Sequence, residues 1–234
     1  MPELFLFDPG PVPSVAIEGR RERYPVRRIF CVGRNYLAHA AEMGARVDKA
    51  TQQPFYFTKS PAHVVESGAT VPYAPGTANL HHEIELVVAL GETGFEVAAD
   101  DAEQLVYGFA VGLDMTRRDL QFAAREANKP WDIAKDFEDA AVLSPIVPRE
   151  RCGPIERGRI ELAVNDEKRQ SADVSQLIWN VREILAHLSR YYRLGPGDLV
   201  FTGTPKGVGP VVAGDRLRGR IDGVGEIALD IGRG

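Results

Sequence analysis

Three acidic side chains stand where predicted strands begin or end. Glu83 and Glu85 are two residues apart at the start of the apolar run IELVVAL, so on a strand both carboxylates project from the same face. Asp114 ends a second apolar run, YGFAVGLD, just before a predicted helix. Three carboxylates suit Mg²⁺, Mn²⁺ or Ca²⁺, whereas Zn²⁺ prefers nitrogen or sulfur ligands. The alternatives are a solvated strand face for the glutamates and a helix cap for Asp114.

Four residues near these carboxylates or on a separate helix offer further chemistry. His81 and His82 precede the glutamates and could ligate a metal, but a site built from carboxylates favours an outer or surface position for them. His39 and Glu42 are three residues apart in GRNYLAHAAEMG, so on a helix they share one face. A carboxylate that fixes the imidazole tautomer raises its basicity, as a water-activating general base requires. An ordinary surface pair is the alternative.

Other polar residues have the chemistry of substrate-binding groups. Lys59 follows FYFT and Lys135 follows PWDIA, so each could direct a cation at an anionic substrate, with an exposed lysine as the alternative. Arg118 and Gln121 share a helix face by their three-residue spacing. The segment TGTPKGVGP at 202–210 offers hydroxyl and backbone N–H groups that could cradle a carboxylate. It lacks the GxxxxGK[ST] order of a phosphate-binding loop.

The elements that would position these residues are mostly strands. Short apolar runs separated by Gly, Pro and Asn predict a strand-rich domain with inserted helices. Strands are predicted at 29–32, 55–58, 84–90, 107–113, 160–164, 199–202 and 227–231. Helices are predicted at 36–43, ended by Gly44, at 117–126, and at 177–188 with Ser175 as a candidate N-cap.

Two segments lack the apolar pattern of a helix or a strand. The polar stretch 45–53, ARVDKATQQ, has no apolar face and predicts a mobile lid. Five prolines within the first 25 residues predict a short extended lead-in, residues 1–25, followed by a catalytic domain at 26–234.

The composition bounds the class of protein. A chain of 234 residues with 44% hydrophobic and 26% charged residues is typical of one globular domain. The net charge of -5 argues against a nucleic-acid surface. Two cysteines are too few for a disulfide framework, and the N-terminal sequence predicts neither a signal peptide nor a membrane span. A cytoplasmic protein is therefore predicted.

Six motifs, in this order, resemble the fumarylacetoacetate hydrolase family, especially its short acylpyruvase and fumarylpyruvate hydrolase members. They are CVGRNYLAHAAEMG, FTKSPAHVV, NLHHEIELVVAL, VGLDMTRRDLQ, KPWDIAKDFEDAAVLSPI and FTGTPKGVGPV, within residues 26–231. Six ordered motifs are more specific than any one of them. The resemblance implies an α+β fold, a mixed β-roll with short inserted helices, and a homodimer.

The resemblance also implies roles for individual residues. Mg²⁺, with Mn²⁺ or Ca²⁺ as alternatives, would be held by Glu83, Glu85 and Asp114. His39 and Glu42 would belong to a lid that closes over the substrate and brings the pair to a water molecule. The positions that match substrate-contacting or charge-stabilising positions of similar enzymes are Lys59, Arg118, Gln121, Lys135 and Thr204.

The reaction that this resemblance implies is hydrolysis of a 2,4-diketo acid, most closely fumarylpyruvate to fumarate and pyruvate in gentisate-type aromatic breakdown. Lys135 would stabilise the oxyanion, and pyruvate would leave as an enolate. Arg34, Arg46 and Lys49 are candidate cations for the second carboxylate. Oxaloacetate decarboxylation and isomerisation of a hydroxy-dienoate use similar enolate chemistry, but decarboxylation needs no activated water. A non-catalytic metal- or ligand-binding protein is the remaining alternative.

Overall fold

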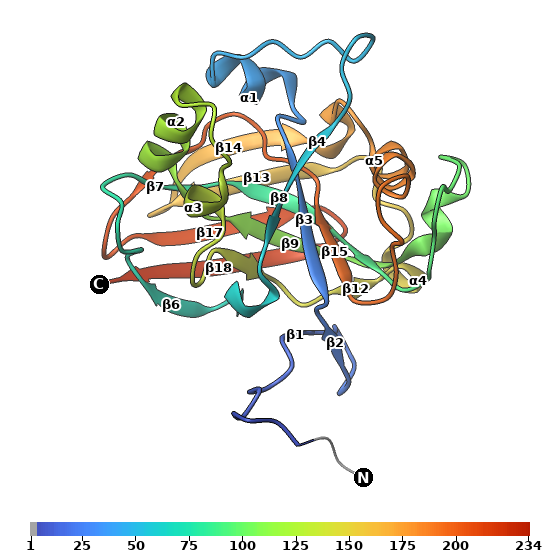
Figure 1. The fold of residues 1–234 in the computed structure, drawn as a ribbon. Helices are drawn as coiled ribbons and strands as arrows, with labels where there is room; N and C mark the ends of the chain where they lie inside the picture. Colours follow the sequence, from blue (N-terminus) through green and yellow to red (C-terminus); the bar gives the residue numbers. More distant parts are fainter. Residues whose placement is uncertain (1–3) are drawn as a thin grey trace.

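Two mixed β-sheets make up most of the computed structural model, which describes residues 4–234 (Figure 1). Among these residues, the larger sheet has eight strands in both parallel and antiparallel pairs. Its path runs β4 (Phe55–Lys59), β3 (Arg28–Gly33), β15 (Asp198–Phe201), β8 (Ile84–Leu90), β9 (Val106–Asp114), β11 (Ala141–Leu143) and β5 (Val64–Glu66), and β12 (Val147–Pro148) pairs with β9. This sheet-dominated architecture confirms the predicted α+β class.

The second sheet and two small ones complete the strands of the described residues. The second sheet runs β14 (Glu167–Asp173), β13 (Arg159–Val164), β17 (Arg216–Ile221), β18 (Gly225–Gly232) and β6 (Ala69–Pro72). A three-stranded sheet joins β10 (Thr116–Arg117), β7 (Leu80–His82) and β16 (Gly209–Val211), and a two-stranded sheet joins β1 (Ser14–Ala16) and β2 (Arg23–Pro25).

Residues of β8 alternate between two hydrophobic cores. Ile84 and Leu86 pack into the larger core together with residues of the five-stranded sheet, such as Leu162. Val87 belongs to a second core on the other side of the strand. Because successive side chains of a strand point to opposite faces, Glu85 lies on the same face as Val87 and is directed away from the core between the two sheets.

The helices of residues 4–234 are short and connect strands. The α-helices are α1 (Leu37–Glu42), α2 (Arg118–Glu126), α3 (Asp132–Lys135), α4 (Arg149–Cys152) and α5 (Val181–Leu188), and the 3₁₀ turns are η1 (Pro61–His63), η2 (Ala102–Leu105) and η3 (Val174–Gln176). In Figure 1, α1, α2 and α3 lie at one end of the molecule, and the N-terminal segment extends from the opposite end. Three predicted functional residues belong to these helices, namely His39 to α1, Arg118 to α2 and Lys135 to α3.

Most of the predicted elements are confirmed. The seven predicted strands correspond to β3, β4, β8, β9, β13, β15 and β18, with ends that differ by at most two residues. The first two predicted helices correspond to α1 and α2. Gly44 has a φ of 67°, a left-handed conformation that glycine adopts readily, and this explains why α1 ends there.

The third predicted helix, at 177–188, is wrong at its N-terminus, because α5 begins at Val181. The preceding residues are held out of the helix by Asn35, whose backbone and side-chain oxygens accept hydrogen bonds from two of their backbone N–H groups, both at 2.8 Å. The helix is then capped by Asn180 in a reciprocal capping box. Ser175, the predicted N-cap, lies instead in the separate turn η3.

The proline-rich N-terminal region is extended, as its sequence predicts. Strands β1 and β2 form its only regular structure among the described residues. The boundary at residue 25 stays a prediction. Both cysteines are free. No helix within residues 4–234 has the length and apolar character needed to cross a membrane.

Candidate active site

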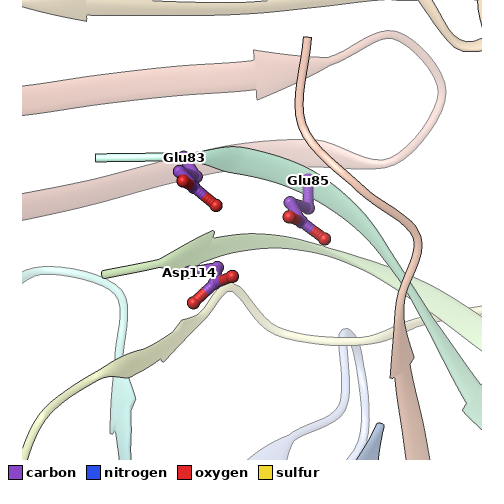
Figure 2. A group of neighbouring side chains, drawn as sticks. All are labelled: Glu83, Glu85 and Asp114. Atoms are coloured by element: carbon purple, nitrogen blue, oxygen red, sulfur yellow. The ribbon is translucent and has the colours of Figure 1, made fainter. Parts of the chain in front are cut away.

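Three carboxylates meet at the larger sheet: Glu85 lies in β8, Asp114 lies in β9, and Glu83 immediately precedes β8. Glu85 of β8 pairs with Gly112 of β9, and the N–H of Asp114 donates to the carbonyl of Glu83 at 2.9 Å. The two-residue period of a strand therefore places all three carboxylates on one face. One oxygen from each residue lies within 4.8 Å of the other two, and Figure 2 shows the side chains directed into a common space.

Buried cations neutralise two of the three carboxylates. Lys135 Nζ donates to Glu83 Oε2 at 2.7 Å and to Asp114 Oδ2 at 2.6 Å. Arg118 also donates to Glu83, and Lys59 Nζ lies 2.8 Å from Asp114 Oδ1. Burial raises the pKa of Glu83, but the charges of Lys135 and Arg118 lower it by more, so its pKa lies below the ordinary value. Glu83 is thereby held ionised.

Glu85 is the carboxylate without a cation. Its Oε2 accepts a hydrogen bond from the N–H of Gly203 at 2.7 Å, and no side chain of residues 4–234 forms an ion pair with it. Burial, followed by the charges of Asp114 and Glu83, raises the pKa of Glu85 well above its ordinary value. A divalent cation would relieve this repulsion, and Mg²⁺ and Mn²⁺ prefer such oxygen donors. The cluster therefore fits a hard metal ion.

The carboxylates line a cleft that holds ≈ 480 Å³ of space, including its open mouth. Glu42 and Lys59 do not line it; Lys59 is buried against Asp114, where its Nζ also donates to two backbone carbonyls. The predicted residues that do line the cleft are Arg34, His39, Glu83, Glu85, Asp114, Arg118, Gln121, Lys135 and Thr204. The fold thus brings together groups from β8, β9, α1, α2 and α3 and from the loop after β15.

The cleft also has lining residues that sequence reasoning missed. Its apolar wall consists of Val32, Met43, Phe57, Phe122 and Trp131. Arg125 lines the cleft as well, and it lies four residues beyond Gln121 on the same face of α2. Helical spacing could have identified Arg125, whereas the position of Trp131 depends on how α3 packs.

His39 and Glu42 form the predicted pair on α1. His39 Nδ1 lies 3.2 Å from Glu42 Oε2, and the N–H of Gly207 donates to both Glu42 oxygens, at 3.0 and 3.2 Å. Burial raises the pKa of Glu42, but the hydrogen bonds from His39 and Gly207 lower it by more. The ionised carboxylate thus fixes the imidazole through Nδ1.

The 202–210 loop uses its N–H groups differently from the prediction. Gly203 donates to Glu85 and Gly207 donates to Glu42, so these two N–H groups hold carboxylates of the protein rather than a carboxylate of a substrate. Gly207 has a φ of 97°, and a Cβ there would lie 2.0 Å from a backbone carbonyl oxygen. Only glycine fits this turn without a shift of the backbone.

Neither of the two neighbouring histidines belongs to the carboxylate cluster. His81 accepts a hydrogen bond from Arg118 Nε at 3.3 Å, and burial together with the charge of Arg118 lowers the pKa of His81 to about 4. His82 lies on the opposite face, where its Nδ1 is 2.9 Å from Gln170 Oε1. These contacts agree with the prediction that the two histidines lie outside a metal site built from carboxylates.

Comparison with known proteins agrees with this geometry. A family model described as fumarylacetoacetate (FAA) hydrolase C-terminal matches residues 28–231. A fumarylpyruvate hydrolase of Ralstonia sp. is 57% identical over 190 residues, which cover 81% of this chain and 98% of the relative. The mitochondrial oxaloacetate tautomerase of Mus musculus is 37% identical over 207 residues, which cover 88% of this chain and 92% of the relative.

A solved structure is similar over nearly the whole length. The crystal structure of fumarylpyruvate hydrolase from Pseudomonas aeruginosa, in complex with Mn²⁺ and pyruvate, superposes with a TM-score of 0.94 at 46% identity. The match covers 99% of this chain and 100% of that one. The chain belongs to the fumarylacetoacetate hydrolase family.

Proposed function

We propose that the protein is a metal-dependent hydrolase that cleaves a carbon–carbon bond of a 2,4-diketo acid, with fumarylpyruvate split to fumarate and pyruvate. The observation that carries this proposal is that His39 lines the same cleft as the cluster of Glu83, Glu85 and Asp114. Hydrolysis needs both an activated water and a cation near the developing negative charge. The relatives from Ralstonia and Pseudomonas aeruginosa support the choice of substrate.

The proposed metal is Mg²⁺, held by Glu83, Glu85 and Asp114, and Mn²⁺ is the ion in the Pseudomonas aeruginosa structure. A divalent ion bound there supplies positive charge to the oxygen atoms of the pyruvyl half of the substrate. Glu85 supports this assignment, because it is a buried carboxylate beside two others and pairs with no cation of residues 4–234.

The remaining roles follow from the contacts of each side chain. His39 accepts a proton from the attacking water, and Glu42 fixes the imidazole for this step. Lys135 contributes positive charge at the oxyanion formed by the attack. Arg118, Gln121 and Thr204 contact the substrate from the wall of the cleft. Lys59 is proposed to position Asp114, since Lys59 does not line the cleft.

The test is a comparison of kcat/KM for fumarylpyruvate and acetylpyruvate at equal Mg²⁺, followed by loss of diketo-acid absorbance. A charge-assisted contact to the second carboxylate contributes about 1.5–3 kcal/mol, which corresponds to a preference of about ten- to a hundredfold. Equal values, or a preference for acetylpyruvate, would indicate a general acylpyruvase. Binding of Mn²⁺ without turnover of fumarylpyruvate, acetylpyruvate or oxaloacetate would indicate a non-catalytic protein.

A second candidate function is enolate chemistry on oxaloacetate. The 37% identity to the oxaloacetate tautomerase of Mus musculus favours it, and decarboxylation or isomerisation would use the same cluster. Adding oxaloacetate to the substrates compared above separates these reactions from hydrolysis. Conversion of oxaloacetate at a higher kcat/KM than fumarylpyruvate would make oxaloacetate the principal substrate.

We also propose a homodimer. Leu4, Phe5, Leu6 and Phe7 form a contiguous apolar stretch with side chains 62–97% exposed, and such stretches mark interaction sites. A second copy of the chain would cover it. Light scattering should give a mass of about twice 25.7 kDa, and a monomer at micromolar concentration would contradict the proposal. The cytoplasmic location and the gentisate-type pathway stay predictions.

A further inference from the structure

Two arginines at the mouth of the cleft are not used by the proposed chemistry. Arg34 and Arg125 both line the cleft, and neither forms an ion pair with any carboxylate of residues 4–234. By contrast, Arg118, which lies deeper in the cleft, is paired with Glu83. The mouth therefore carries two positive charges without a protein anion, close to a substrate that is itself anionic.

Arg34 is held in place by its surroundings. Its backbone has a φ of 59°, a strained conformation for a residue other than glycine and one that is frequent at functional sites. Its guanidinium carbon lies 5.6 Å from the centre of the Phe55 ring and 5.7 Å from that of Trp131. A Cβ on Gly33 would lie 2.0 Å from the Phe55 ring, so the absence of a side chain there lets this ring pack beside Arg34.

Arg125 approaches the same place from α2. It lies seven residues after Arg118 and four after Gln121, so the three side chains follow one face of the helix from the carboxylates to the mouth. Its guanidinium donates to the carbonyl oxygen of Met43 at 2.7 Å, and this contact orients it toward the C-terminal end of α1. Burial, and then the charge of Arg125, lowers the pKa of Arg34. The two cations therefore repel each other.

We propose that Arg34 and Arg125 together bind the distal carboxylate of a dicarboxylate substrate, an assignment that rests on the proposed function. An anion between the two guanidinium groups would remove their repulsion and accept hydrogen bonds from both. The other two candidate cations are less suitable. Lys49 pairs with Glu183 at 2.7 Å, and neither Arg46 nor Lys49 lines the cleft.

The dimensions agree with this assignment. Extended backbone advances roughly 3.5 Å for every three bonds, so the terminal carboxyl carbons of a seven-carbon chain such as fumarylpyruvate lie roughly 7 Å apart. Arg118 and Arg125 are separated by roughly 10 Å along the axis of α2, at 1.5 Å per residue. An arginine side chain is long enough to span the difference. The cleft is also lined by the apolar side chains of Met43, Phe122 and Trp131, which suit the uncharged middle of the substrate.

The experiment measures kcat/KM for fumarylpyruvate, which has the second carboxylate, and for acetylpyruvate, which lacks it, in variants that remove the charge of one arginine. Arg125→Met should lower kcat/KM for fumarylpyruvate by about tenfold or more, the usual effect of losing a charge-assisted hydrogen bond, and should change kcat/KM for acetylpyruvate by less than about twofold. Arg34→Met should act in the same direction. Arg125→Lys should keep most of the preference, and inhibition by fumarate should weaken in Arg125→Met.

Lys129→Met is the matched control, because Lys129 is an exposed cation just after α2 that does not line the cleft. It should leave both substrates unaffected. Equal losses for both substrates in Arg125→Met, or no loss for either, would overturn the inference. Failure of the unmodified enzyme to cleave fumarylpyruvate would instead overturn the proposed function, so the two outcomes are distinguishable.

Discussion

Replacement of Glu42 by glutamine tests whether the carboxylate acts through His39. The carboxylate accepts hydrogen bonds from His39 and from Gly207, whereas an amide has one oxygen acceptor for these two donors. Loss of one charge-assisted hydrogen bond costs about 1.5–3 kcal/mol. The side chain of Glu42 is 35% exposed, so solvent screening places the cost near the lower limit, and about a tenfold fall in kcat is expected.

The matched variant His39→Ala removes the proposed base itself and should lower kcat by about 10² to 10⁴-fold. Both variants should bind Mn²⁺ normally by calorimetry, because His39 and Glu42 lie outside the carboxylate cluster. Glu126→Gln, on an exposed position of α2 that does not line the cleft, serves as the control. If Glu42→Gln matched the unmodified enzyme, or if either variant lost metal binding, the assignment of this pair to water activation would be refuted.

Two further outcomes are expected. Glu85→Ala should weaken Mn²⁺ binding, measured by calorimetry, by at least about a hundredfold, which is more than loss of an outer-shell partner costs. The same variant should lose hydrolysis, and activity retained in excess EDTA would contradict this expectation. Gly219→Ala should reduce the free energy of unfolding by about 1–3 kcal/mol through overpacking, because its Cβ would lie 2.6 Å from Ile84 Cδ1 and 2.9 Å from Leu162 Cδ1. An unchanged urea midpoint would show that the two sheets can separate at this point.

The carboxylate cluster could be anticipated because it depends on local geometry. The two-residue period of a strand places Glu83 and Glu85 on one face in any sheet. The two-residue period does not show which strand lies beside β8 in the sheet. Asp114 joins the cluster because β9 pairs with β8 in the register that sets Gly112 opposite Glu85. This pairing was not predicted from the sequence, and only the family resemblance placed Asp114 with the two glutamates.

Elements that depend on tertiary contacts were harder to predict. Strand β14, EKRQSAD, is an edge strand rich in polar residues, so it lacks the apolar pattern that identified the other strands. Strand β17, RLRGRI, alternates exposed arginines with buried residues, a period-two signal that could have been used. The start of α5 is set by Asn35, which is distant in the sequence, and no local pattern contains that information.

The balance of charge at the site also depends on tertiary contacts and not on local sequence. Glu83, Glu85 and Asp114 are buried together with three cations, Lys59, Lys135 and Arg118, so the six formal charges would cancel by simple counting. The ion pairs are not shared evenly among the three carboxylates, because all three cations pair with Glu83 or Asp114. Among the described residues, Glu85 accepts a hydrogen bond only from the Gly203 N–H. Burial of so many ionisable groups is a poor way to stabilise a fold, since each charged group loses hydration. The arrangement is better explained by metal binding, because a divalent cation bound here would stabilise the ionised form of Glu85, the one carboxylate of the cluster that pairs with no cation of residues 4–234.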